Sequence, residues 1–247
     1  MLCSCTAQGF INSTVQDFVF CFFEVYFLMS VFSFCVIIID MKQQRLDGLA
    51  DGIFAIVMTL LAFDIKVPAL SGVSDTSLLQ GLIQESGVFL SFVLSFALLF
   101  TYWRAHHFLT SVYAKNVTVG LANYNALFFL LIILVPFSSK LLGTYSELPF
   151  AIFVYGTNVI AIGVTLYFMR RHIESSPHID TLEIHKDDQV SGYVRILFPV
   201  VSALLAIVIS FWSPLASLVL FTVAILFNLA PASTNFIHKW IVEASRE

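Results

Sequence analysis

Ionisable side chains frame one apolar stretch of the chain, RLDGLADGIFAIVMTLLAFDIKVP, which covers residues 45–68. Arg45, Asp47 and Asp51 stand near its start, and Asp64 and Lys66 stand near its end. Asp47 fits an ordinary place at a helix N-terminus, where backbone N–H groups and the helix dipole favour a carboxylate. Asp51 lies a turn deeper, where a charged group is costly unless it is paired or faces water. Asp51 therefore needs a partner.

Two adjacent histidines, His106 and His107, are the other residues that suggest chemistry, either metal binding or acid–base catalysis with Asp51. Neighbouring residues point about 100° apart on a helix, so the pair cannot easily hold one metal ion. The sequence contains no HExxH, GxSxG or CxxC motif. Histidines also occur in HIESSPHIDTLEIH (His172–His185), but their loose spacing favours a solvated loop over a metal site. We therefore expect no enzyme, no bound metal and no cofactor.

The composition places these residues in a membrane protein. Hydrophobic residues make up 59% of the chain and charged residues 11%, and the mean hydropathy is +0.91. A soluble domain usually has about a quarter of its residues charged. The net charge of −4 and the absence of a basic patch with interleaved aromatics give no sign of nucleic-acid binding.

The first 40 residues differ from the rest. They hold all four cysteines, at positions 3, 5, 21 and 35, and no Lys or Arg. Met41 then opens MKQQRLDG, which resembles a natural protein start. We interpret residues 1–40 as a hydrophobic extension or a mis-assigned start, and residues 41–247 as the working domain. The alternative is an additional span, roughly from Asp17 to Ile39.

Six hydrophobic segments after Met41 are long enough to cross a bilayer as helices, which needs about 20 apolar residues. Barrel strands would instead show about ten residues of alternation. The segments are Gly48–Val67, Gly87–Phe108, Thr118–Leu142, Phe150–Met169, Val194–Trp212 and Leu215–Pro231. The sequence thus predicts an all-α membrane protein, with polar connections such as VPALSGVSDTS between the spans.

Basic residues set the predicted topology. With Met41 in the cytosol, ten of the 12 Lys and Arg residues fall on the cytosolic side, and only Lys66 and Lys140 fall outside. This is the positive-inside pattern of a multi-pass protein. Both ends of residues 41–247 are therefore expected in the cytoplasm.

Ordered motifs within the first four segments resemble those of the TMEM175 family of potassium-permeable channels. The family begins its first helix with Arg, three residues and then Phe-Ser-Asp, and RLDGLAD matches this signature at Arg45 and Asp51. YWRAHHF resembles the end of the family's second helix, LVPFSSKLLG the end of its third, and Tyr155-Gly156 with Asn158 its fourth. The signature's Phe and Ser are Leu49 and Ala50 here, which removes one hydroxyl from the network near Asp51.

The resemblance implies a passive channel that conducts K⁺, with other monovalent cations as further candidates, across the plasma membrane of a prokaryote. A single six-helix unit implies a homotetramer in the lipid bilayer, with the first helix around a central pore. The sequence has no TVGYG filter of ordinary potassium channels. A secondary transporter, coupled to protons or other cations, is the alternative. It would predict inverted repeats and acidic residues at mid-membrane, and neither is evident.

Within the first segment, Ile56, Leu60 and Phe63 follow one another at i, i+4 and i+7, on one stripe of a helix. By resemblance, Ile56 and Leu60 match the apolar constriction, and Phe63 stands where relatives often have Leu. Thr59 matches a threonine close to this neck, so its hydroxyl is a candidate for selectivity. Without the resemblance, packing or lipid contact would be the preferred explanation of the stripe.

Asp64 is expected near the outer mouth, where four carboxylates would concentrate cations. The alternative is an ordinary interfacial residue paired with Lys66. At the cytosolic end we expect a structural polar network between the first two helices, in which Trp103 and a histidine donate to Asp51. Its members would be Arg45, Asp51, Trp103 and His106 or His107.

Overall fold

The computed structural model describes residues 43–69, 72, 74–181 and 186–229, all of which belong to one compact unit, Met41–Glu247. The predicted additional span, the boundary at residue 40 and the end of the sixth segment lie outside these residues. The described helices are α2 (Gln43–Ala62), α3 (Asp75–Gln84), α4 (Ser86–His107), η1 (Phe108–Tyr113), α5 (Val119–Ile133), α6 (Val135–Thr144), α7 (Pro149–Ser175), α8 (Lys186–Ser210) and α9 (Pro214–Leu229).

The fold class predicted from the sequence is confirmed. The only β feature among the described residues is an isolated antiparallel bridge between Ala114 and Thr181. Four stretches are long and apolar enough to cross a membrane, namely Ser86–Tyr113, Val119–Thr144, Pro149–Ser175 and Gly192–Ser210. The shorter α9 is also apolar, whereas α2 carries charge at its N-terminal end. Six spans therefore remain a prediction.

Helix α3 occupies a stretch that begins within the predicted polar connection. Its start has a recognisable cause: Ser74 is the N-cap, and its side chain accepts a hydrogen bond from the backbone N–H of Ser77. The Ser77 hydroxyl reaches back to the N-cap in return, which completes a capping box. This local arrangement starts a helix that hydropathy alone does not reveal.

Two predicted segments have internal irregularities. The second ends in a π-helical turn, η1, beyond His107. The third is split into α5 and α6 at Leu134, two residues before Pro136. Proline lacks the N–H that an uninterrupted helix would use and crowds the preceding turn, so a break before it is expected.

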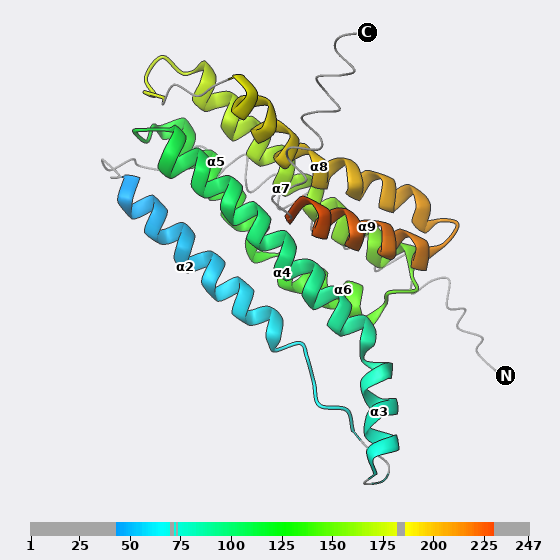
Figure 1. Cartoon of the computed structure of the whole chain (residues 1–247). Helices are drawn as coiled ribbons and strands as arrows, with labels where there is room; N and C mark the ends of the chain where they lie inside the picture. Colours follow the sequence, from blue (N-terminus) through cyan, green and yellow to red (C-terminus); the bar gives the residue numbers. More distant parts are fainter. Residues whose placement is uncertain (1–42, 70–71, 73, 182–185, 230–247) are drawn as a thin grey trace, which may run out of the picture. The chain divides into compact units, whose positions relative to one another are not determined.

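Helix α2 lies at one side of the described bundle (Figure 1). It contacts α4, α5, α6 and η1, while α7, α8 and α9 pack against one another and α7 also contacts α5 and α6. The long sequence between α7 and α8 is held near the α4–α5 connection by Asn116. The Asn116 amide donates to the carbonyl of His178 at 2.7 Å, and its oxygen accepts from the N–H of Asp180 at 2.9 Å.

Two glycines set the close approach of α4 to α6. A methyl group built at Gly143 would lie 2.5 Å from the Ser91 hydroxyl oxygen and 3.0 Å from the Cα of Val88. A methyl group at Gly87 would lie 2.9 Å from the carbonyl oxygen of Gly143. Because backbone atoms are among these neighbours, side-chain movement alone cannot make room.

Gly143→Val is therefore expected to lower the free energy of unfolding by about 3 kcal/mol, the upper part of the usual range for overpacking. Chemical denaturation of the purified protein in detergent would measure this loss. The control is Thr144→Val, which puts the same side chain at the next, exposed position of α6. Equal stability of the two variants would show that the α4–α6 crossing is not tight.

Candidate pore-lining helix and its polar supports

Helix α2 has two contrasting apolar faces. One face packs into the core of the bundle with five residues that are at most 3% exposed: Leu46, Ala50, Phe54, Val57 and Leu61. The opposite face is uncovered in the single chain. Gly48 and Gly52 lie on it, and a methyl group built at either would meet nothing within 4 Å. A span with one face fully packed and the other open is suited to contact with further copies of the chain, with lipid, or with a pore.

The residues predicted to form the constriction all lie on the open face. Ile56 is 61% exposed, Leu60 is 45% exposed, and Phe63, in the turn just after α2, is 79% exposed. Thr59 is exposed beside them, and its hydroxyl donates to the carbonyl of Ile56 at 2.7 Å. The structure therefore places the four residues together and away from the described core.

Asp51 contacts one of its predicted partners. The indole N–H of Trp103 on α4 donates to Asp51 Oδ1 at 2.9 Å. The ring of His107, one turn further along α4, stacks on Trp103 with a centroid separation of 5.8 Å. His107 thus packs against the hydrogen-bond donor, Trp103, rather than against the Asp51 carboxylate. The His107 ring is itself hydrogen-bonded to the Ser111 hydroxyl.

The expectation that a histidine donates to Asp51 is wrong for the described contacts. His106 is only 1% exposed and lies on another side of α4, where its Nε2 is hydrogen-bonded to the side-chain oxygen of Asn125 on α5. Its ring stacks on Phe128 at 4.9 Å between centroids. The turn of about 100° between adjacent helical residues separates the two histidines. His106 is thus part of the α4–α5 packing.

The other charged residues at the N-terminal end of α2 have different contacts. Asp47 accepts a hydrogen bond from the Thr110 hydroxyl at 3.1 Å, which joins α2 to η1. Arg45 is exposed and makes no hydrogen bond or ion pair with any other described residue. Ala50, in place of the serine of the resembling signature, is 3% exposed within the apolar core. A methyl group at this position suits its surroundings without a polar partner.

Trp103→Phe is expected to lower the free energy of unfolding by about 1 kcal/mol, because it removes one hydrogen bond to a carboxylate and keeps most of the ring. Thermal or chemical denaturation followed by circular dichroism would measure the change. The matched control is Trp212→Phe, since Trp212 is 80% exposed between α8 and α9. An equally small effect of both substitutions would mean that the Asp51 contact contributes nothing to holding α2.

Asp64 has a partner that the sequence interpretation did not name. Lys140 Nζ on α6 lies 3.0 Å from Asp64 Oδ1, with side-chain exposures of 58% for the lysine and 20% for the aspartate. The alternative pairing with Lys66 is not the one that the structure shows. The sequence places Asp64 and Lys140 on the same, outer side of the membrane. Their contact also requires α6 to end beside α2, which sequence alone does not specify.

Motif residues of three helices meet in a buried hydroxyl cluster. The Ser95 hydroxyl donates to Ser139 at 2.8 Å and lies 3.0 Å from the Tyr155 hydroxyl. The Asn158 amide donates to the Ser138 hydroxyl at 3.1 Å. Hydrogen bonds of this kind join helices inside a membrane, where water offers no alternative partner. The PFSS and YGxN motifs thus hold α4, α6 and α7 together.

A second cluster was not predicted. Arg170 on α7 is 1% exposed, and its Nε donates to Glu174 Oε1 at 2.9 Å. Its guanidinium carbon lies 3.9 Å from the centroid of the Tyr193 ring, and the Tyr193 hydroxyl donates to Glu174. The spacing of Arg170 and Glu174 at i and i+4 was the available signal. The predicted segment ended at Met169 because two arginines follow it.

Metal-binding chemistry finds no support in the described ranges. No group of three or more His, Cys, Asp or Glu side chains gathers there in a way that could hold an ion. The described histidines at 106, 107 and 172 are each engaged with neighbouring protein groups. The candidate site is therefore the open face of α2 with its supports on α4 and α6.

Comparison with known proteins supports the same family as the motifs of the sequence. Residues 45–136 match the family described as endosomal/lysosomal potassium channel TMEM175. The chain is 30% identical over 194 residues to a potassium channel of Chamaesiphon minutus, and the match covers 76% of this chain and 94% of that protein. It is also 25% identical to the endosomal/lysosomal proton channel TMEM175 of Mus musculus, over 78% of this chain and 40% of that protein.

A solved structure also resembles the fold. The crystal structure of a lysosomal potassium-selective channel TMEM175 homolog from Chamaesiphon minutus aligns with a TM-score of 0.64 at 26% identity. The alignment covers 75% of this chain and 95% of that chain. Sequence and fold therefore point to the same group of proteins.

Proposed function

The chain belongs to the TMEM175 family of channels, and on that premise we propose that it conducts K⁺ passively through a pore lined by α2 in a homotetramer. Membership makes the protein a multi-pass membrane channel and not a coupled transporter. The proposal concerns three further properties: the preference for potassium, the tetrameric assembly and the residues that line the pore. Conduction of other monovalent cations is part of it.

The observation that carries the proposal is the open face of α2. In a bilayer, an exposed apolar stripe alone could simply contact lipid. Here the stripe stands beside Gly48 and Gly52, which leave room for another backbone, and beside the exposed carboxylate of Asp51. Since a charged group in a span usually faces protein or water, this combination favours a face turned toward other subunits and an aqueous axis.

Four copies of that face around an axis would place Ile56, Leu60 and Phe63 in successive apolar rings. An apolar constriction limits ion passage because water leaves it readily. Thr59 directly precedes Leu60, and its hydroxyl oxygen can coordinate a partly dehydrated cation. Selectivity would thus arise without a TVGYG filter.

The residues around the neck have supporting roles in this proposal. Trp103 and His107 hold the Asp51 end of α2 on α4, with Arg45 free to face the cytosol. His106 acts through the packing of α4 on α5. Asp64 stands at the outer mouth, paired with Lys140. Residues 41–247 form the channel domain, and residues 1–40 are an extension outside it.

The direction in the membrane follows from charge. The described basic residues near the end where α2 begins and α4 ends are Arg45, Arg104, Lys115, Arg170, Arg171 and Arg195, so this end is proposed to be cytosolic. The protein would reside in the plasma membrane, with both ends of residues 41–247 in the cytoplasm.

Ion flux in proteoliposomes tests the function. The purified full chain is reconstituted, and efflux is recorded under potassium or sodium gradients of equal size, with protein-free liposomes as the control. The proposal predicts passive efflux that is faster for K⁺. Native mass spectrometry of the same sample should give four copies. Absence of flux in folded tetramers, or flux that requires a gradient of a second solute, would refute a potassium channel.

A further inference from the structure

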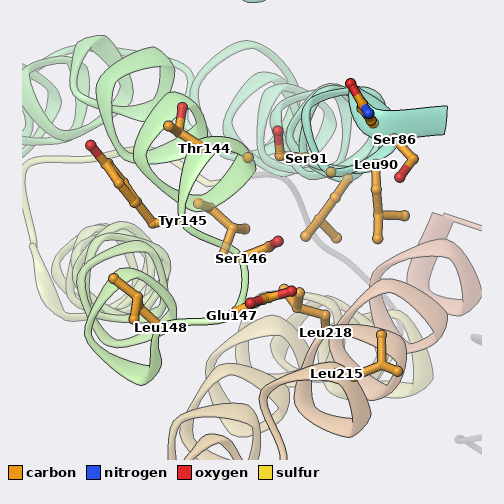
Figure 2. A pocket seen from close by; sticks show the side chains of 15 residues that line it. Ser86, Leu90, Ser91, Thr144, Tyr145, Ser146, Glu147, Leu148, Leu215 and Leu218 are labelled. Carbon is orange, nitrogen blue, oxygen red and sulfur yellow. The ribbon is translucent and has the colours of Figure 1, made fainter. Parts of the chain in front are cut away.

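A cavity of about 820 Å³ lies away from α2, between the N-terminal ends of α4 and α9 and the connection from α6 to α7 (Figure 2). None of its lining residues belongs to α2. Its size falls in the ordinary range for small-molecule sites, which is about 300 to 1,000 Å³. It is therefore large enough for a ligand that the conduction pathway does not account for.

The lining changes from polar to apolar along the direction of the membrane-spanning helices. Most of its polar residues stand at the ends of candidate spans, with Ser86 at the start of α4 and Ser146 and Glu147 between α6 and α7; Ser91 lies deeper, where its hydroxyl donates to the carbonyl of Val88 in its own helix. Leu90 and Leu94 follow Ser86 by four and eight residues, which is about 6 and 12 Å deeper along α4. This order matches a bilayer leaflet, with headgroups outside and acyl chains inside.

The inner wall is firm and apolar. Leu94 is 0% exposed, and Leu142 is 2% exposed. Behind them, the close approach of Gly87 and Gly143 fixes the spacing of α4 and α6. Leu215, at the start of α9, is 71% exposed at the rim. An alkyl chain entering from the rim would contact leucine side chains on both α4 and α9 (Figure 2).

The charged groups that line the cavity restrict the chemistry of the polar head group that a bound ligand can carry. Among the described lining residues, Glu147 is the only carboxylate and none is Lys, Arg or His, so an anionic head would meet its repulsion with only the partial charges of helix N-termini to offset it. Glu147 makes no ion pair or hydrogen bond with another described residue. The positive ends of α4 and α9 lie at the same level, which disfavours a cationic head. Carboxylate and hydroxyl groups together accept and donate hydrogen bonds to an uncharged polyol.

We propose that this cavity binds a neutral membrane lipid with a hydroxyl-bearing head, held by Glu147 and the neighbouring serines, with its acyl chain along the leucines of α4 and α9. The charge pattern favours this head over phosphate-bearing lipids, which would need a basic partner. The site is separate from the proposed pore, so it does not depend on conduction.

Photo-crosslinking in proteoliposomes tests this assignment. Three lipids with the same diazirine-bearing acyl chains and different heads, galactosyl, phosphocholine or phosphoglycerol, are incorporated at trace amounts with the full chain. Mass spectrometry then locates the labelled peptides. The galactosyl lipid is expected to label the cavity segments around Leu90 and Leu215 at least about threefold more than the other two. Labelling around Leu204, an exposed position on α8, should not depend on the head.

Two variants connect the labelling to the cavity. Glu147→Gln should remove most of the preference for the galactosyl head, while Asp75→Asn, which neutralises an exposed carboxylate outside the lining, should preserve it. Leu215→Trp should fill the rim and lower cavity labelling at least fivefold, with labelling around Leu204 unchanged. Equal labelling by all three lipids, or a preference that survives Glu147→Gln, would overturn the proposal.

Discussion

Leu60→Ala is expected to raise the potassium efflux from proteoliposomes at least tenfold and to reduce the preference for K⁺ over Na⁺. In the proposed tetramer the substitution removes four side chains from one apolar ring at once. A wider ring holds water more easily, so the barrier to a hydrated ion falls. A reduction of about 1.4 kcal/mol in that barrier already gives a tenfold faster flux. The sodium flux is expected to increase more than the potassium flux, because a wider neck discriminates less between the two ions.

The matched control for this experiment is Leu204→Ala on α8. Leu204 is 51% exposed and Leu60 is 45% exposed, so both substitutions remove a similar amount of surface leucine. Only the position on α2 is proposed to face the pore. An unchanged flux for Leu60→Ala in folded tetramers, or an equal increase in both variants, would remove α2 from the conduction pathway.

Arg170→Met is expected to lower the free energy of unfolding by about 3 kcal/mol, the largest stability loss predicted for a single charge in this chain. The substitution keeps much of the side-chain volume and removes the guanidinium. Glu174 then loses its 2.9 Å ion pair, and the Tyr193 ring loses the cation above it. Arg170 is 1% exposed but the Glu174 side chain is 23% exposed, so the loss is placed at the lower end of the roughly 3 to 5 kcal/mol typical for removing one partner of a buried ion pair. Chemical denaturation in detergent, followed by circular dichroism, would measure the loss.

The next residue provides the control. Arg171 is exposed, so Arg171→Met removes the same charge from the same helix without replacing a buried side chain. Its effect should stay below about 0.5 kcal/mol, as for most surface substitutions. If both variants unfold at the same denaturant concentration, the Arg170 cluster does not hold α7 against α8.

Helical spacing predicted that one face of α2 carries the apolar stripe, and the family resemblance predicted that this face is open. The spacing of Ile56, Leu60 and Phe63 places them on one stripe by helical geometry alone, and the structure places them at the surface. Hydropathy also located the long spans, because their length must match the bilayer. The use of that stripe as a pore wall rests on family resemblance, since periodicity does not distinguish a pore from lipid.

Long-range pairings could not be predicted in the same way. Asp64 could pair with either of two lysines, and only the three-dimensional approach of α6 to α2 selects Lys140. His106 and His107 are neighbours in sequence, yet one packs against Asn125 and the other against Trp103. The predicted fourth segment ends just before Arg170, because hydropathy does not recognise a buried arginine that pairs with a glutamate.

The Asp64–Lys140 pair has a consequence for how current would depend on salt. Four carboxylates alone at the mouth would act as a surface potential, and conductance would remain high in dilute solution because cations accumulate there. In the proposed tetramer each of these carboxylates would have a counter-charge within 3.0 Å, so the mouth would be a ring of dipoles in which these charges cancel. Such a ring has a short-ranged field, already weak at one Debye length of about 10 Å in 0.1 M salt. Single-channel conductance should therefore fall in proportion to the bulk potassium concentration, without a plateau at low ionic strength.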